Sequence, residues 1–332
     1  MANPAPPSDD GTMLAAVLER FGAPYTLKRV PRPGPPQGHD LVIKVLAASY
    51  CHTDAVFAAG NMSHKALPRV GSHEFAGEIV AMGPLVVPGD RGGLDRGVRV
   101  GVVGLAYHPC GVCYECTHSD DADIPGYSVY CPRATNLGLS RDGGFQEYCL
   151  VDSRQVAPLP VDGGGLSAVQ AAPMMCAGLT IWAALQHPRV RAACCGAWCG
   201  TTWVATAAAA VATGATDDQP NSERGVDAAI VLPEAQEAFD TGMALLRNHG
   251  TLVVVSFPPT PFALKAQDVV FRDIAVVGTL LGSQRQLRDM LAFCTAHGVA
   301  AQVRTFPLRQ VNELVEEYHR GFGGKLVVDM TL

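Results

Sequence analysis

The sequence predicts an α/β protein with two domains, the first built from β-strands and the second from alternating strands and helices. The chain has 332 residues, which is enough for two domains of ordinary size. From about residue 13 to 160 the sequence reads as short strands interrupted by Gly and Pro. After Pro160 helical periodicity appears, and helical segments then alternate with strand-like ones. The first pattern is typical of a β-barrel, and the second of a parallel sheet with crossover helices.

Each expected strand is a short apolar run, rich in Val, Ile or Leu and bounded by turn residues. In the first domain such runs occupy 41–45, 76–81 and 99–103. The second part predicts, in order, a helix at 167–186, a strand at 226–232, an amphipathic helix at 233–247, strands at 251–256 and 274–281, and a helix at 285–297. The tail reads as β again at 303–307 and 324–330. We therefore expect one domain at 1–160, completed by 301–332, and a second at 161–300.

Composition limits the classes of function. The net charge of −6 and the lack of a basic cluster argue against a nucleic-acid partner. The first twelve residues are rich in Pro, Ser and Asp, without the apolar core of a signal peptide. The longest apolar run, 203–212, is too short to span a bilayer. We therefore expect a cytoplasmic enzyme that acts on a small molecule and has no membrane partner.

Three separate residues offer the ligands of a catalytic zinc ion. Cys51, His73 and Cys176 would supply two thiolates and one imidazole. Three protein ligands with an open fourth position are typical of catalytic zinc. A single Cys or His is far more often a core or surface residue, so the prediction depends on the motifs around all three.

Four ordered motifs carry a resemblance to a known family. They are Cys-His-Thr-Asp at 51–54, Gly-Ser-His-Glu-Phe-Ala-Gly-Glu at 71–78, Asp-Gly-Gly-Phe-Gln-Glu-Tyr at 142–148 and Ala-Pro-Met-Met-Cys-Ala-Gly-Leu-Thr at 172–180. Through them nearly the whole chain resembles the zinc-containing alcohol dehydrogenases of the medium-chain dehydrogenase/reductase family. The resemblance implies a GroES-like β-barrel catalytic domain followed by a Rossmann-like domain.

The resemblance also implies roles for individual residues. Cys51, His73 and Cys176 correspond to the catalytic zinc ligands, and Glu74 to an acidic residue beside the metal that can become an extra ligand. Thr53 resembles the hydroxyl that bonds the substrate oxygen and passes on its proton. Asp54 resembles the carboxylate that orients the ligand His, as ligating imidazoles generally require. The ordinary alternatives are a structural Thr53 and a solvated Asp54.

A second cluster predicts a structural zinc site. Of the eleven cysteines, four crowd together in a chain without a secretion signal, which favours metal ligation over disulfides. Cys110, Cys113 and Cys116 have C-x2-C-x2-C spacing and Cys131 follows, an arrangement that lets neighbouring thiolates bind one metal. The cluster resembles the structural zinc lobe of the family, although the stretch from Cys116 to Cys131 is longer than usual. Loop insertions of this kind cost little closure entropy, so we expect four Cys ligands and two zinc ions per chain. The alternative is a lobe without metal.

The expected cofactor site, unlike the zinc site, departs from the pattern of the family. Gly196 and Gly200 match the glycine turn of the family, whereas Cys199 and Thr202 do not, and Trp198 adds bulk inside the turn. A dinucleotide site needs the backbone of this turn to approach the pyrophosphate closely, and side chains there obstruct that approach. The sequence therefore predicts a degenerate, non-functional glycine turn and makes NAD(P) binding doubtful.

The segment after this turn is short. A helix expected at 203–213 is followed by 216–225 before the next strand, whereas one strand–helix–strand unit needs about 30 residues. In the strand order 3-2-1-4-5-6 we expect strands 2 and 3 to be missing, which trims one edge of the sheet and removes the ribose-binding residue. Asp217 and Asp218 are expected to be solvated loop acids rather than its substitutes.

Three functions remain open from the sequence. The favoured one is zinc-dependent Lewis-acid catalysis without nicotinamide, such as cyclisation, isomerisation, aldol-type reaction or elimination. Thr53, with His52 or His64, would then move protons. The second is an NAD(P)-dependent alcohol dehydrogenase, and the third a non-catalytic scaffold stabilised by zinc. The apolar edge expected at 274–281 further predicts a homodimer.

Overall fold

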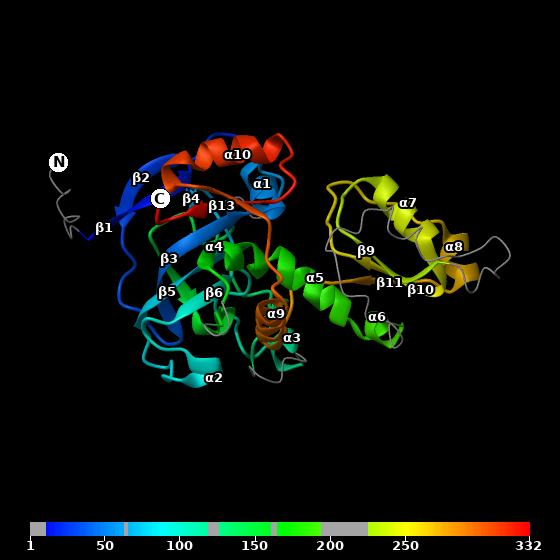
Figure 1. Ribbon diagram of the computed structural model, residues 1–332, viewed down its shortest axis with the longest axis horizontal. Coiled ribbons are helices and arrows are strands. Elements are labelled where there is room, and N and C mark those ends of the chain that lie inside the picture. Colours follow the sequence, from blue (N-terminus) through cyan, green and yellow to red (C-terminus); the bar gives the residue numbers. More distant parts are fainter. Residues whose placement is uncertain (1–10, 63–65, 119–125, 161–164, 194–224) are drawn as a thin grey trace. The chain divides into compact units, whose positions relative to one another are not determined.

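The computed structural model describes residues 11–62, 66–118, 126–160, 165–193 and 225–332. The chain forms two compact units (Figure 1). The barrel unit comprises 1–179 and 283–332, and the inserted unit comprises 180–282. The inserted unit thus interrupts the barrel unit in sequence.

The larger sheet of the barrel unit has seven strands in the order β12-β13-β3-β5-β6-β8, with β7 also paired to β3. These strands are β3 (Asp40–Tyr50), β5 (Glu74–Met82), β6 (Arg99–Val103), β7 (Tyr148–Asp152), β8 (Val156–Pro158), β12 (Val303–Phe306) and β13 (Lys325–Asp329). Only β12 and β13 pair in parallel; the other pairs are antiparallel. Because β3 pairs with three strands and is buried along most of its length, it is the centre of the sheet.

A smaller antiparallel sheet, in the order β2-β1-β4, completes the β part of this unit. Its strands are β1 (Thr12–Leu18), β2 (Thr26–Pro31) and β4 (Arg69–Val70). The two sheets share one hydrophobic core, in which Leu18 of the small sheet and Ile43, Phe75 and Ile79 of the large sheet are buried. Buried apolar residues of both sheets therefore form a single core in the β-rich domain that the sequence predicts.

The helices of the barrel unit are short apart from α9 and α10. They are α1 (His52–Ala58), α2 (Asp90–Gly93), α3 (Tyr114–Thr117), α4 (Ala168–Ala171), α9 (Gln284–His297) and α10 (Val311–His319), with 3₁₀ turns at Ser153–Gln155, Ala172–Met175 (η2) and Leu308–Gln310. The Ser283 hydroxyl caps α9 by accepting from Gln286 N at 3.1 Å. Helix α10 packs on β13 with Val311 and Leu314 buried, one turn apart (Figure 1).

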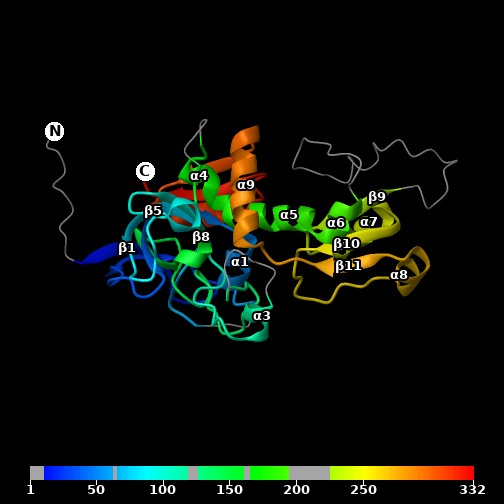
Figure 2. The same cartoon turned by 90° about the horizontal axis from the view of Figure 1, so that it is seen from below.

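The inserted unit contains a three-stranded parallel sheet in the order β11-β10-β9. Its strands are β9 (Val226–Val231), β10 (Leu246–Val254) and β11 (Ala275–Gly278) (Figure 2). Neighbouring residues of β10 enter different clusters: Leu252 packs with Phe239 of α7 (Gln236–Leu245), and Val253 with Val190 of α6 (Pro188–Ala193). Helices thus cover both faces of the sheet, as the predicted parallel sheet with crossover helices requires. The remaining helices are α5 (Ala177–Gln186), which begins before the boundary between the units, and α8 (Ala266–Arg272).

Four element predictions need correction. The single helix expected at 167–186 is broken into α4, η2 and α5, with Cys176 between the last two. The helix expected to reach residue 247 ends at Leu245, and β10 begins at Leu246 instead of 251 because it continues as a register-shifted partner of β9. Strand β11 covers only Ala275–Gly278 of the expected 274–281. The helix expected at 203–213, Asp217 and Asp218 lie outside the described residues.

No single helix in the described ranges is long and apolar enough to cross a membrane. The pair Ala168–Met175 and Ala177–Gln186, bent by 56°, passes the same criterion by length and composition alone.

Candidate metal centres

The structure brings together the three residues that the sequence predicts as catalytic zinc ligands. Donor atoms of Cys51, His73 and Cys176 all lie within 4.8 Å of one another. The two sulfur atoms are 3.9 Å apart. Cys51 and His73 are buried and Cys176 is partly buried, so the cluster lies inside the barrel unit.

Strand register explains how Cys51 meets His73. In the antiparallel pair of β3 and β5, Ser49 lies opposite Glu74. Cys51 follows the last residue of β3, and His73 precedes the first residue of β5. The two ligands therefore leave the same end of neighbouring strands, where antiparallel pairing places them side by side.

An unusual backbone conformation delivers His73. Ser72 has a φ of 70° although it is not glycine, and its buried hydroxyl donates to the Ser49 carbonyl oxygen at 2.9 Å. On the other side, a Cβ at Gly104 would collide with the His73 carbonyl oxygen. The surrounding packing holds both the positive φ of Ser72 and the close approach of Gly104 to His73. Such strained backbone is typical of functional sites. Sequence reasoning missed both, although the glycine at 104 was visible.

Cys176 reaches the site because the helical segment breaks there. Its φ and ψ of −124° and −74° are not helical, and it lies between η2 and α5. The residues of η2 are buried and pack on β3, β5 and β6. The break therefore turns the third ligand away from a regular helix and toward the ends of β3 and β5.

Asp54 connects two of the ligands. One carboxylate oxygen lies 3.1 Å from His73 Nδ1, and the other accepts a hydrogen bond from Cys51 N at 2.9 Å. Asp54 is buried in the first turn of α1, where Cys51 is the N-cap residue. Because the carboxylate accepts from Nδ1, Nε2 of His73 is the ring nitrogen that faces the two thiols.

Glu74 has a partner that the sequence analysis did not identify. Lys325 Nζ lies 2.6 Å from Glu74 Oε1, and Glu74 is fully buried. Burial raises the pKa of Glu74 to about 7, and the Lys325 ammonium opposes that rise. A lysine directly before the apolar run Leu326–Val328 was the available signal, but only the pairing of β13 with β3 shows where Lys325 lies.

The two thiols of this site, Cys51 and Cys176, have pKa values shifted in opposite directions. The hydrogen bond from Cys176 holds the pKa of Cys51 well below its usual range, with Lys325 contributing in the same direction. The same contact, together with burial, raises the pKa of Cys176. The site therefore already favours one thiolate, the form that binds metals.

The residues present fit a zinc ion. His73 Nε2 is buried and makes no hydrogen bond to any described residue, a costly arrangement that a metal would relieve. Two thiolates would balance the double charge of the ion, and three donors leave a fourth position for a ligand. Zinc would be held by Cys51, His73 and Cys176.

The remaining predicted residues of this region surround the centre. Thr53 is partly buried in the first turn of α1, and His52 is exposed beside it. The His52 imidazole contacts Tyr318 Oη through Nδ1 at 2.7 Å. His64 lies outside the described residues, as do Gly196 and Gly200 of the predicted glycine turn.

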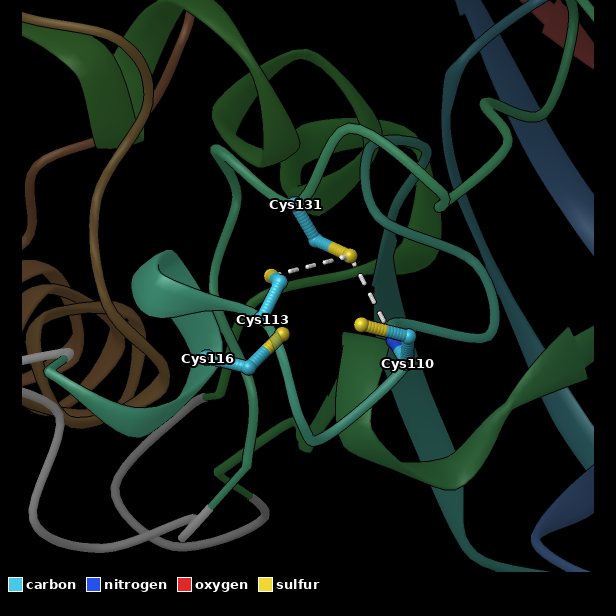
Figure 3. Close-up of side chains that lie close together, drawn as sticks. All are labelled: Cys110, Cys113, Cys116 and Cys131. Atoms are coloured by element: carbon cyan, nitrogen blue, oxygen red, sulfur yellow. Dashed lines mark hydrogen bonds between the residues drawn. The ribbon is translucent and has the colours of Figure 1, made fainter.

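The four cysteines of the second cluster also converge. The sulfur atoms of Cys110, Cys113, Cys116 and Cys131 lie within 4.8 Å of one another and point toward a common centre (Figure 3). The sulfur atoms of Cys113 and Cys131 are 3.9 Å apart, and Cys110 N donates a hydrogen bond to Cys131 Sγ at 3.3 Å. Hydrogen bonds from the backbone lower the pKa of Cys110 to about 6. Four clustered thiols without a disulfide are the donor set of a closed zinc site.

Comparisons with known proteins agree with this picture. Residues 37–161 match the model of the alcohol dehydrogenase GroES-like domain, and residues 163–296 match that of the zinc-binding dehydrogenase. An alcohol dehydrogenase of Moraxella sp. (strain TAE123) is 28% identical, covering 96% of this chain and all of the relative. One from Geobacillus stearothermophilus is 29% identical over 95% of this chain and 99% of its own.

Solved structures show the same fold. The alcohol dehydrogenase of Aeropyrum pernix superposes with a TM-score of 0.74 at 22% identity, covering 95% of this chain and 99% of that one. Acetophenone reductase of Geotrichum candidum, solved in complex with NAD, gives a TM-score of 0.73 at 21% identity and covers 98% of both chains. With consecutive family models over most of its length and both cysteine-containing clusters assembled, the chain belongs to the zinc-containing alcohol dehydrogenases of the medium-chain dehydrogenase/reductase superfamily.

Proposed function

We propose that this protein is a zinc-dependent oxidoreductase that interconverts a small alcohol and its carbonyl compound with NAD(P). The observation that carries the proposal is the cluster of Cys51, His73 and the partly buried Cys176, with His73 Nε2 lacking a hydrogen-bond partner among the described residues. Zinc bound there would polarise the substrate oxygen as a Lewis acid. Curated relatives that match nearly the whole chain are alcohol dehydrogenases, which supports a redox reaction over the non-redox chemistry that the sequence favours.

Residues around the predicted zinc sites would have separate roles in the reaction and in stability. Asp54 holds the His73 ring, and Glu74 with Lys325 balances charge behind the triad. Thr53 lies two residues after Cys51 and would relay the substrate hydroxyl proton, accepting it at its own hydroxyl oxygen while releasing its hydroxyl proton toward solvent. A bound nicotinamide would supply the hydride acceptor. Cys110, Cys113, Cys116 and Cys131 would hold a second zinc ion that stabilises the lobe around α3.

Similar proteins whose structures contain NAD or NADP(H) support NAD(P) as the cofactor. The Geotrichum reductase was solved with NAD, and a cinnamyl alcohol dehydrogenase of Helicobacter pylori with NADP(H). In this chain the three parallel strands of the inserted unit supply the kind of sheet on which dinucleotides bind. Gly196 and Gly200, which lie outside the described residues, are the candidates for contact with the cofactor phosphates.

A second candidate is zinc-dependent chemistry without nicotinamide, on a sheet that lacks strands 2 and 3. It is favoured by the short connection at 214–225 and by Trp198 in the glycine turn. The alignment with the Moraxella relative extends over 358 residues although this chain has only 332, so the relative contains stretches that this chain lacks. This observation supports a shortened chain.

Calorimetric titration with NAD⁺ and NADP⁺, combined with zinc analysis and turnover assays, separates the two candidates. The redox proposal expects binding of at least one cofactor and cofactor reduction that is lost in His73→Ala. Arg96→Gln, an exposed charge of the barrel unit, is a control that should retain both. Zinc-dependent conversion of a carbonyl substrate without cofactor binding would overturn the redox proposal in favour of the second candidate.

We also propose a homodimer formed through β11. Among the described strands β11 pairs only with β10, and Val276 on it is 40% exposed. An unpaired apolar edge strand is a ready surface for a second copy of the chain.

A further inference from the structure

We propose that Tyr318 is a positioning residue for His52, and that its hydroxyl fixes the imidazole beside the ligand Cys51. The contact joins Tyr318 Oη and His52 Nδ1 at 2.7 Å. The inference rests on the proposed function, because it gives His52 a place in the reaction at the Cys51–His73–Cys176 centre. Tyr318 reaches the site from α10, far from α1 in the sequence, and Figure 1 shows the two helices side by side.

The Tyr318 ring is held independently of its hydroxyl. It packs edge-on against Tyr50, with ring centroids 5.1 Å apart and an interplanar angle of 76°. Tyr50 is itself buried and stacks on Phe145 at 6.4 Å. Aromatic contacts of this geometry hold a ring in one orientation, so the hydroxyl at its tip is presented to His52 at a defined point.

Helix α10 is also anchored without this hydroxyl. At its start, Asn312 accepts from Tyr25 N at 2.8 Å and donates to the Tyr25 carbonyl oxygen at 2.9 Å. Val311 and Leu314 are fully buried in the same core. Removing the hydroxyl should therefore leave the helix in place, which separates a positioning role from a packing role.

The exposed position of His52 at the start of α1 explains why its imidazole needs a partner such as the Tyr318 hydroxyl. His52 is the first residue of α1, directly after the ligand Cys51, and its side chain is exposed while Cys51 and Asp54 are buried. An imidazole has two ring nitrogens with different roles, and a partner at one of them selects the tautomer and the direction in which the other points. The Tyr318 hydroxyl at Nδ1 therefore selects one tautomer of His52 and fixes the direction in which its ring faces.

Kinetics of a double-mutant cycle test the proposal. Tyr318→Phe keeps the packed ring and removes the hydroxyl, so kcat/KM should fall about 2- to 10-fold, the range expected for one hydrogen bond. The same substitution in a His52→Ala background should have no further effect, because the group through which Tyr318 acts is absent. Tyr148→Phe, a partly buried tyrosine on β7, is the matched control and should leave kcat/KM unchanged. An undiminished loss in the His52→Ala background would show that the Tyr318 hydroxyl acts through a group other than His52 and would overturn the proposal.

A second measurement does not depend on activity. In ¹⁵N spectra of the zinc-loaded protein with labelled histidine, assigned by loss of a signal in His52→Gln, His52 should show a single tautomer. Tyr318→Phe should shift these resonances toward the average of the two tautomers. Identical His52 spectra in both proteins would refute the positioning role. If the shift occurs while no alcohol is oxidised with either cofactor, the proposed function is wrong and the Tyr318–His52 assignment stands.

Discussion

Lys325 and Glu74 form an ion pair, 2.6 Å long, between the strands on either side of β3. Glu74 lies opposite Ser49 in the β3–β5 pair, and Leu326, the residue after Lys325, lies opposite Tyr50 in the β3–β13 pair. The two side chains thus meet at the end of β3, where Cys51 follows. The C-terminal strand therefore supplies a positive charge next to the predicted catalytic zinc.

Removing that charge should destabilise the fold. Lys325→Met leaves the Glu74 carboxylate buried without its cation, a change that typically costs about 3–5 kcal/mol. We expect a loss of this size in urea unfolding, and recovery of most of it in Lys325→Met with Glu74→Gln. Equal instability of the single and double variants would mean that Lys325 contributes by packing alone.

Glu74 also predicts how stability depends on pH in the zinc-free protein. Its folded pKa of about 7 exceeds its usual 4.5, so the folded state binds the additional proton between these values. Stability from this group is present below 4.5 and is lost as the pH rises toward 7. The urea midpoint of the zinc-free wild type should fall across this interval relative to Glu74→Gln. Parallel pH profiles for the two proteins would contradict the prediction.

Asp54→Asn should weaken the predicted catalytic zinc site more than the fold. The amide oxygen can still accept from Cys51 N, whereas the negative charge next to His73 Nδ1 is lost. Loss of such a partner typically reduces metal affinity about 10- to 100-fold. Chelator competition should show this loss at one of two zinc ions, while Asp95→Asn, an exposed acid, should show none. Unchanged affinity in Asp54→Asn would refute the orienting role.

The lobe around α3 should lose its metal independently of the other site. Cys113→Ser removes one of four clustered ligands, so the zinc content should fall from two ions to one per chain. The melting temperature should fall as well, because binding to the folded state adds to stability. Elemental analysis of Cys51→Ala with Cys176→Ala should also give one ion, retained in the lobe. Two ions in either protein would contradict the assignment.

The homodimer proposal predicts a mutation-sensitive edge. Val276→Lys places a charge on exposed β11, and charges on edge strands oppose pairing. Sedimentation at micromolar concentration should show a dimer for the wild type and a monomer for Val276→Lys. Val87→Lys, at an exposed position of the barrel unit, should remain dimeric. A monomeric wild type would refute the proposal.

The sequence predicts the fold class because strands and helices differ in local periodicity, and β6 has the expected bounds of 99–103. It also identifies Cys51, His73 and Cys176 as one group, since their residue types and motifs suit one metal. It does not predict the break at Cys176 or the positive φ of Ser72, because both depend on packing against residues distant in the chain. The sequence also gives no sign of the contact between Lys325 and Glu74, because only the pairing of distant strands brings the two residues together.

The insertion of 180–282 between the two parts of the barrel unit has an evolutionary consequence. All seven predicted zinc ligands are encoded outside that stretch, in the segment that ends at Leu179. Deletions or substitutions inside the insertion can accumulate without altering a ligand or its spacing in the gene. Selection can therefore change the inserted unit while all seven predicted zinc ligands are retained.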